Sequence, residues 1–295
     1  MRFCLVLVLA ASATFAQSSA QSSEWTLEFA NHYSVQPNIT YVTSNNYESK
    51  LDLYERRDAA APQATVIYIH GGGWTGGTKE ASTDKILPWL EMGWNVVNVE
   101  YRLARVSNAP AAVEDSLCAL RWVAANAARH HMDVNRIVTS GNSAGGHLAL
   151  TTALIPESAG LDNECPGVPL PKVAAVVDWY GITDVNDLLE GPNRRAYAVQ
   201  WLGSAPERAE IARRVSPLAY VRPGLMPILM IQGDADPTVP YEHSLRLKAA
   251  LEKAGVPNEL HTIPGGKHGG FSAPENVAAW GAVRQFLKKN GLPVN

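Results

Sequence analysis

Short apolar runs, separated by polar and glycine-containing stretches, recur along most of the chain. The runs are rich in Val and Ile, and their length suits central strands of a sheet that is covered on both faces. We therefore predict strands over residues 39–43, 51–55, 65–70, 95–101, 136–139, 173–179, 227–232 and 259–263.

Longer stretches between these runs repeat apolar residues at helical spacing. In residues 109–130, Val113, Leu117 and Leu120 recur on one helical face, and Pro110 stands near the start, where a helix tolerates proline. Strands that alternate with helices predict an α/β fold, with a mostly parallel central sheet and helices on both faces. The first two strands have no helix between them, which predicts an antiparallel start. The other predicted helices span residues 81–92, 144–155, 241–254 and 274–289.

Residues 184–215 interrupt this alternation. The stretch is polar and helical in pattern, contains Trp201 and several arginines, and is too long for a simple loop between a strand and a helix. We interpret it as a small lid packed over a site, with a plain surface helix as the alternative. Residues 17–295 otherwise show no internal repeat and no linker after residue 23, so we predict a single α/β domain.

Composition and charge exclude one class of function. The chain is 46% hydrophobic and 18% charged, as ordinary globular proteins are, and its formal net charge is -3. No stripe of Lys and Arg is interleaved with aromatic residues. We therefore expect no nucleic-acid partner.

The N-terminus has the pattern of a secretory signal peptide. Arg2 supplies a positive charge, residues 3–11 are uninterruptedly apolar, and small residues follow. We predict that residues 1–16 are removed after Ala16, or alternatively after Ala20. The apolar run is too short to span a bilayer, so we expect a secreted or periplasmic protein without a stable membrane anchor. A buried N-terminal strand is the alternative interpretation.

Two cysteines remain after the predicted signal peptide, Cys118 and Cys165. An oxidising compartment permits a disulfide between them, provided that their Cα atoms come close enough. Cys118 also suits the buried face of a helix as a free thiol, so both states remain open. Neither cysteine lies in a metal-ligand or nucleophile pattern.

The strongest chemical signal is residues 139–150, TSGNSAGGHLAL. A predicted strand runs into Gly141, Asn142, Ser143, Ala144 and Gly145, and a predicted helix follows directly. This is the arrangement of a nucleophile elbow, in which a serine sits on a strained turn and the flanking glycines allow close backbone approach. The positive end of the helix dipole then faces the charge that develops on the substrate. The motif is weak alone, but its strand–turn–helix context makes it specific.

A second signal, HGGGW at residues 70–74, follows the strand predicted over residues 65–70. A glycine run can turn several backbone N–H groups toward one point, because no side chains obstruct them. Such donors stabilise the oxyanion of acyl transfer, and each lowers the activation free energy by about 3–4 kcal/mol. A phosphate-binding loop is the alternative, but the Lys-Ser/Thr pair that such a loop needs is absent.

An acid and a base follow at the ends of two later predicted strands. Asp234 and Asp236 come after the strand at 227–232, and His268, flanked by glycines, comes after the strand at 259–263. The order serine, aspartate, histidine is the one that α/β folds with a nucleophile elbow use. We favour Asp236 as the acid, because Asp234 stands where a turn-forming hydrogen bond is expected.

The other histidines suit structural roles better. His70 is expected to anchor its own loop, and His147, one turn after the serine, to pack beneath the site. The remaining histidines are assigned to a helix end (His130, His131) and to surface or edge positions (His32, His243, His261).

Together, HGGGW, GNSAGGHLAL, GDADPTVP and GKHGG resemble the acetyl-esterase and carboxylesterase branch of the α/β-hydrolases. This branch overlaps the hormone-sensitive-lipase group and the bacterial feruloyl and carbohydrate-acetyl esterases. The resemblance extends from about residue 51 to residue 287. Two features depart from the hormone-sensitive-lipase pattern: Asn142 replaces the usual aspartate, and the acid motif ends in DPTVP. Both are more similar to the feruloyl and acetyl esterases, and GDADPTVP also resembles the prolyl-oligopeptidase clan.

By position, the resemblance implies an α/β-hydrolase fold in which Ser143 is the nucleophile, Asp236 the acid and His268 the base. It assigns the oxyanion hole to the backbone N–H groups of Gly72, Gly73 and Ala144. A serine hydrolase of this kind needs no metal or organic cofactor. Because His268 must be neutral to accept the serine proton, we expect kcat/KM to fall on acidification.

For the substrate we expect an ester of a short-chain or small aromatic acid, either as a small molecule or linked to a polysaccharide. Removal of acetyl or feruloyl groups from plant polysaccharide would suit a secreted enzyme of this branch. Trp74, Tyr180, Trp201 and Val239 are candidate pocket walls, with the protein core as the alternative place for each. An amide-cleaving serine hydrolase, either a peptidase or an arylformamidase, is the rival activity. A non-catalytic binding protein on the same fold is the remaining alternative.

Overall fold

A single eight-stranded sheet organises the computed structural model, which describes residue 27 and residues 29–294. The predicted signal peptide lies outside the described residues. The strand order is β1-β2-β4-β3-β5-β6-β7-β8. β1 pairs antiparallel with β2 and β2 with β4, and all other pairs are parallel. The strands are β1 (Tyr33–Ser44), β2 (Tyr47–Arg56), β3 (Gln63–Ile69), β4 (Asn95–Val99), β5 (Met132–Asn142), β6 (Ala175–Trp179), β7 (Ile228–Gly233) and β8 (Asn258–Ile263).

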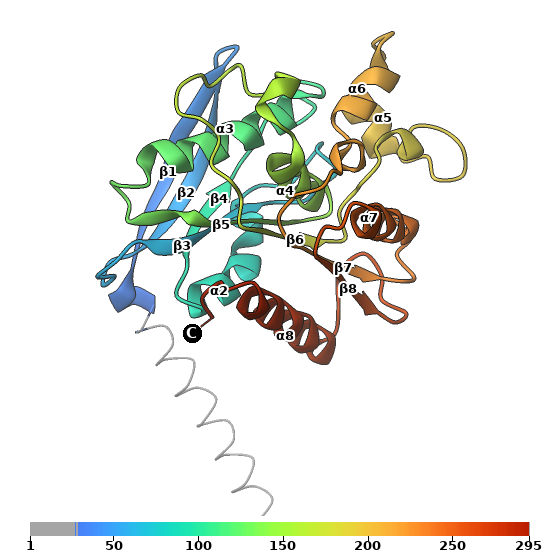
Figure 1. Ribbon diagram of the computed structural model, residues 1–295. Coiled ribbons are helices and arrows are strands. Elements are labelled where there is room, and N and C mark those ends of the chain that lie inside the picture. The colour runs from blue at the N-terminus through green and yellow to red at the C-terminus, as the bar shows by residue number, and fades with distance from the viewer. Residues whose placement is uncertain (1–26, 28, 295) are drawn as a thin grey trace, which may run out of the picture.

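Helices cover both faces of this sheet, with α2 and α8 on one face and α3, α4 and α7 on the other (Figure 1). The central strands are buried on both faces, as their apolar runs predict. The mostly parallel α/β class and its antiparallel start are therefore confirmed. The helices are α2 (Thr83–Glu91), α3 (Ala111–Asn126), α4 (Ala144–Leu154), α5 (Ala196–Leu202), α6 (Arg208–Arg214), α7 (Glu242–Lys253) and α8 (Ala273–Lys289).

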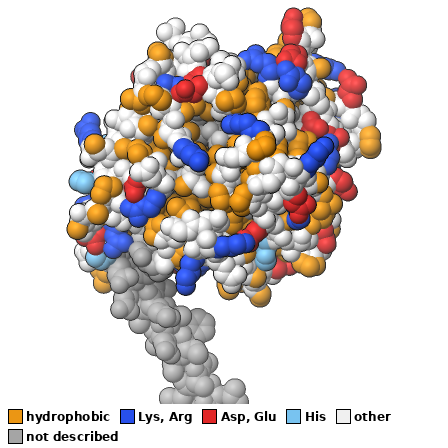
Figure 2. All heavy atoms as spheres, viewed as in Figure 1, with side chains coloured by type: hydrophobic (Ala, Val, Ile, Leu, Met, Phe, Trp, Pro, Cys, Tyr) orange, Lys and Arg blue, Asp and Glu red, His pale blue; other side chains and the backbone are white. Residues whose placement is uncertain are grey.

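The segment 184–215 holds α5 and α6, which stand together at one corner of the molecule (Figure 1). Its inner side is packed against the rest of the protein: Trp201 of α5 is completely buried, and Arg195 donates to the carbonyl oxygen of Thr238 at 2.9 Å. The outer side of α6 carries both basic and acidic side chains (Figure 2). On the face shown in Figure 2, basic groups are scattered among acidic and apolar ones.

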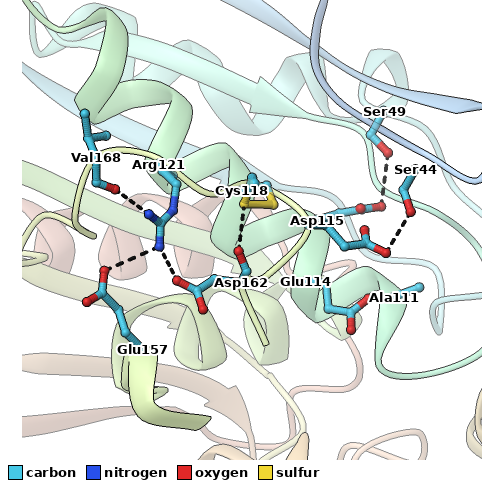
Figure 3. Close-up of a disulfide and its surroundings, with 12 residues drawn as sticks. Ser44, Ser49, Ala111, Glu114, Asp115, Cys118, Arg121, Glu157, Asp162 and Val168 are labelled. Carbon is cyan, nitrogen blue, oxygen red and sulfur yellow. Dashed lines mark hydrogen bonds and ion pairs between the residues drawn. A yellow bond between two sulfur atoms is a disulfide. The ribbon is translucent and has the colours of Figure 1, made fainter. Parts of the chain in front are cut away.

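Cys118 and Cys165 form a disulfide, with their Cα atoms 5.6 Å apart. The bond links α3 to the connecting segment between α4 and β6, residues 155–174, which is called the excursion below (Figure 3). One turn further along α3, Arg121 forms an ion pair with Asp162 of the same excursion. Of the two states that the sequence left open, the structure has the bridge. None of the helices among the described residues is both long and apolar enough to cross a membrane.

Candidate active site

Ser143 lies on a sharp turn between the last residue of β5 and the first residue of α4. Its backbone has φ 58° and ψ -122°, a strained conformation for a residue with a side chain. The turn needs glycine on both sides. A Cβ at Gly141 would lie 2.4 Å from the carbonyl oxygen of Ile69, and one at Gly145 would lie 2.0 Å from the same atom. The predicted elbow is therefore present in the backbone.

Ser143, His268 and Asp236 form a continuous hydrogen-bonded chain. Oγ of Ser143 lies 2.8 Å from Nε2 of His268, and Nδ1 of His268 lies 2.7 Å from Oδ2 of Asp236. The carboxylate accepts the Nδ1 proton, which leaves Nε2 with a lone pair for the serine hydroxyl. The side chain of Asp236 is fully buried, whereas that of His268 is one-fifth exposed. The base is therefore reachable from solvent and its orienting acid is not.

Backbone hydrogen bonds hold Asp236 for this role. Its Oδ1 accepts the N–H groups of Thr238 at 2.7 Å and Val239 at 3.0 Å, so both carboxylate oxygens are engaged. The rival Asp234 instead accepts the N–H of Gly265 at 2.6 Å. Asp234 thus fixes the turn, as its position after the strand suggests, and Asp236 faces the histidine.

The glycine loop after β3 runs through an unusual backbone path, with φ 118° at Gly72 and φ 60° at Gly73. A Cβ at Gly72 would lie 2.1 Å from the carbonyl oxygen of Gly76, so only glycine fits there. Within the described part of the chain, the N–H groups of Gly72, Gly73 and Ala144 donate no hydrogen bond to the protein. These are the three donors that the family resemblance assigns to an oxyanion hole.

For three of the four candidate pocket walls, the structure has the alternative, a place in the core. Trp74, Trp201 and Val239 are completely buried in the main core cluster and are not among the walls of the cavity that Tyr180 lines. Trp74 and Trp201 stack on each other with ring centroids 4.1 Å apart. Large apolar side chains beside a site are most stable when they pack together, and here the segment 184–215 brings Trp201 onto Trp74. Tyr180 does line a cavity.

That cavity has a volume of about 340 Å³ and reaches Asn142 and Gly269, the chain neighbours of Ser143 and His268. Tyr180 lines the cavity and also contacts His268, with the two rings edge to face and their centroids 4.8 Å apart. Burial raises the pKa of Tyr180 to about 12, so its hydroxyl remains protonated at neutral pH. The walls of the cavity combine aromatic rings with polar groups. They are formed by Tyr68, Asp84, Lys85, Asn142, Trp179, Tyr180, Gly269, Gly270, Phe271, Asn276 and Trp280.

Of these wall residues, the sequence predicts only Tyr180. Nothing in the sequence marks Asn142 as a wall residue, yet its Oδ1 accepts the Tyr68 hydroxyl at 3.0 Å at the edge of the cavity. Phe271 stands three residues after His268, which is the one signal that could have singled it out, whereas Trp280 lies further along, within α8.

Among the other histidines, His70 anchors its own loop as expected, since its Nδ1 donates to the carbonyl oxygen of Gly71 at 2.7 Å and its ring stacks on Tyr101. The expectation of a surface or edge position for His243 is wrong. His243 is completely buried in α7, where its Nδ1 accepts the N–H of Thr183 at 3.1 Å. The buried loop after β6 supplies that partner, which the pattern of α7 alone does not reveal.

The chain is similar to a known protein family and to named relatives. The family model described as BD-FAE matches residues 51–251. The chain is 30% identical to esterase LipQ of Mycobacterium tuberculosis over 220 residues. This alignment covers 71% of this chain and 51% of LipQ. The chain is also 27% identical over 248 residues to an ethyl acetate hydrolase of Pseudomonas putida, at 78% and 74% coverage. The chain thus spans about half the length of the mycobacterial relative.

Solved structures agree with this grouping. A truncated carbohydrate esterase from gut microbiota superposes with a TM-score of 0.76 at 25% identity, covering 88% of this chain and 96% of that one. Esterase 2 of Thermogutta terrifontis with bound butyrate has a TM-score of 0.74 at 25% identity, with 89% and 95% covered. Both likenesses extend over nearly the whole described chain.

Proposed function

The chain belongs to the BD-FAE family and has the α/β-hydrolase fold, and on that premise we propose that it is a serine hydrolase of carboxylic esters. The observation that carries the proposal is the unbroken chain of hydrogen bonds from Ser143 through His268 to Asp236. Such a chain activates a serine hydroxyl for attack on a carbonyl carbon. The names of the relatives, which are esterases and an ethyl acetate hydrolase, support the ester as substrate.

The reaction consists of two acyl transfers. His268 removes the Ser143 proton while Oγ attacks the ester carbonyl, and the resulting oxyanion accepts the N–H groups of Gly72, Gly73 and Ala144. Collapse of this intermediate expels the alcohol, which takes the proton from His268, and leaves an acyl-enzyme. Water then repeats the attack on the acyl carbon with His268 as base, which releases the acid and regenerates the serine.

We further propose that the substrate is an ester of a short-chain or small aromatic acid, such as an acetyl or feruloyl group on plant polysaccharide. The cavity beside Asn142 supports an aromatic acid, because its aromatic walls can stack on a planar ring and its amides can bind hydroxyl groups. The likeness to a carbohydrate esterase supports a sugar-linked ester. The N-terminal pattern supports secretion or export to the periplasm, where such polymers are met.

Covalent labelling tests the nucleophile. A fluorophosphonate should modify the protein at Ser143, and Ser143→Ala should abolish labelling and reduce ester turnover by about 10⁴-fold or more. Ser158→Ala, which changes an exposed serine outside the site, is the matched control and should behave as the wild type. Labelling that survives in the Ser143 variant would contradict the assignment, and a wild type that is neither labelled nor active would favour a binding protein.

A hydrolysis panel tests the substrate. Purified protein is assayed on acetyl, butyryl, octanoyl and feruloyl esters, and on an anilide matched to the best ester. We expect the acetyl and feruloyl esters to give the highest kcat/KM. Preference for octanoyl would overturn the proposed substrate class, and an anilide cleaved as fast as its ester would replace the esterase with an amide hydrolase.

A further inference from the structure

The glycine loop that carries the oxyanion donors continues its unusual backbone path into a residue that is not glycine. Trp74 has φ 57°, following φ 118° at Gly72 and φ 60° at Gly73. A bulky residue in this conformation costs about 1–3 kcal/mol and persists only where its surroundings hold it in place. The position of the Gly73 N–H group therefore depends on whatever fixes Trp74.

The indole of Trp74 is held by ring contacts with Trp201 and Tyr197 and by one hydrogen bond. The Trp74 carbonyl oxygen also accepts the Ala104 N–H at 2.8 Å. The Trp74 ring stacks on Trp201, and its Nε1–H donates to Nδ1 of His147 at 3.2 Å. Both rings are completely buried, as is His147. A buried indole N–H without an acceptor costs about 1–3 kcal/mol, so the lone pair on Nδ1 of His147 favours this placement of Trp74.

His147 is itself part of the helix that begins at the nucleophile. Its backbone N–H donates to the carbonyl oxygen of Ser143 at 3.0 Å, so the ring projects from the first turn of α4. At the other end of the ring, Nε2 lies 2.6 Å from the carbonyl oxygen of Val215 and must donate to it. This bond places the proton on Nε2 and leaves Nδ1 free to accept from Trp74. Burial lowers the pKa of His147 to about 3, which keeps this neutral form over a wide pH range.

We propose that His147 is a positioning residue. Through the Trp74 indole it holds the glycine loop of residues 70–74, the oxyanion loop, against α4, the helix that begins after Ser143. This inference rests on the proposed function. Nδ1 of His147 carries this role. Nε2 anchors the end of the segment 184–215 at Val215, a separate task. Because a displacement of about 1 Å in a catalytic group costs up to 100-fold in rate, loss of the Trp74 contact lowers kcat without removing any reacting group.

Two amide substitutions test the two ring nitrogens of His147 separately. The amide oxygen of Asn falls near the place of Nδ1, so His147→Asn keeps an acceptor for Trp74 and loses the donor to Val215. Gln reaches the place of Nε2, so His147→Gln keeps the donor and loses the acceptor. We expect kcat of the Asn variant to stay within about threefold of the wild type. We expect the Gln variant to lose about tenfold or more in kcat at nearly unchanged KM.

Two further measurements exclude a general loss of stability. A phenylboronic acid, which mimics the tetrahedral intermediate, should bind the Gln variant more weakly by the same factor by which kcat/KM falls. The unfolding temperature should fall similarly in both variants. His243→Asn changes another fully buried histidine, whose ring bonds Thr183 within the described part of the chain, and it should lower the unfolding temperature and leave kcat unchanged.

Trp74→Phe tests the same contact from its other end, because it removes the N–H and keeps an aromatic ring against Trp201. It should reproduce the kcat loss of His147→Gln, and the double variant should lose little more. Asn and Gln variants with equal kcat, or a Trp74→Phe variant with wild-type kcat, would overturn the inference while the active wild type leaves the esterase intact. An inactive wild type would instead overturn the proposed function.

Discussion

Backbone strain in this protein collects around the candidate site. Non-glycine residues with positive φ among the described residues are either asparagines, which tolerate this region, or one of Trp74, His131, Ser143 and Tyr180. Three of these last four meet at the nucleophile, the oxyanion loop and the cavity wall. Strain of this kind survives where surrounding contacts outweigh it, and it therefore marks the site independently of any sequence motif.

The glycines of the elbow give a sharp test at this scale. In Gly145→Ala, the new Cβ would meet backbone oxygens of Ile69 and His70, which cannot move without displacing the oxyanion loop. We expect the free energy of unfolding to fall by about 3 kcal/mol or more, and turnover to be lost. Urea unfolding followed by tryptophan fluorescence measures the first effect and an ester assay the second.

Gly281→Ala is the matched control for this substitution. Gly281 lies within α8, where an added Cβ meets nothing within 4 Å. It should raise the free energy of unfolding by about 0.5–1 kcal/mol, because alanine restricts the unfolded chain and favours the helix. A Gly145→Ala variant as stable and active as the wild type would show that the elbow can relax.

Single residues were predictable from the sequence where chain order and strand ends decide their place. Ser143, Asp236 and His268 each follow a predicted strand, and parallel strands bring such positions to one edge. For Trp74 and Trp201 the sequence left a pocket wall and the core open, because their partners lie far apart in the sequence and only the packed structure joins them. The partner of Asn142 likewise depends on the register between β3 and β5, which no local pattern encodes.

At the scale of elements, the disulfide links α3 to the excursion between α4 and β6. The same region holds a buried ion cluster, in which Arg102 contacts Asp115 of α3 and Glu164, the neighbour of Cys165. The bridge and the cluster therefore fasten the same two pieces of chain. Strand and helix positions were predictable from periodicity, but this pairing was not, because it depends on a Cα distance across 47 residues of sequence.

We expect the double variant Cys118→Ala/Cys165→Ala to lower the free energy of unfolding by about 3–4 kcal/mol, the loop-closure entropy for a loop of this length. Turnover should be unchanged, since neither α3 nor the excursion supplies a candidate site residue. Urea unfolding measures the loss. The wild type under reducing conditions should approach the variant, and the variant itself should not respond to reductant. A loss below about 1 kcal/mol would show that the ion cluster alone holds the excursion.

At the scale of the whole molecule, buried groups with opposite pKa shifts act on stability in the same pH range. Burial lowers the pKa of His147 to about 3 and that of His243 to about 4. The unfolded chain protonates both near pH 6.5, so these two residues make stability fall as the pH drops from 6.5 toward 4.5. Burial raises the pKa of Asp178 and of Glu114 to about 7, and Glu164 adds to the shift of Glu114.

The two buried acids keep their protons in the folded protein where the unfolded chain has lost them, so they make stability rise as the pH drops through the same range. The effects of the two histidines and of the two acids on the free energy of unfolding have opposite signs and nearly cancel. The stability of the wild type should therefore change little from pH 6.5 to 4.5. Asp115, whose pKa burial also raises, adds to the acid side, so the small net change should be a rise in stability on acidification.

Removal of one member from either side should unmask the other. Asp178→Asn deletes one acid, so relative to the wild type its free energy of unfolding should fall by about 1.4 kcal/mol for each unit of acidification between pH 6.5 and 4.5. His243→Asn deletes one histidine and should show the opposite slope, with stability rising on acidification. Urea unfolding at half-unit pH steps measures both, with Glu190→Gln, an exposed carboxylate, as control. Parallel curves for all four proteins would mean that the buried groups ionise in the folded state as they do in the unfolded chain, and that the interior around them admits water.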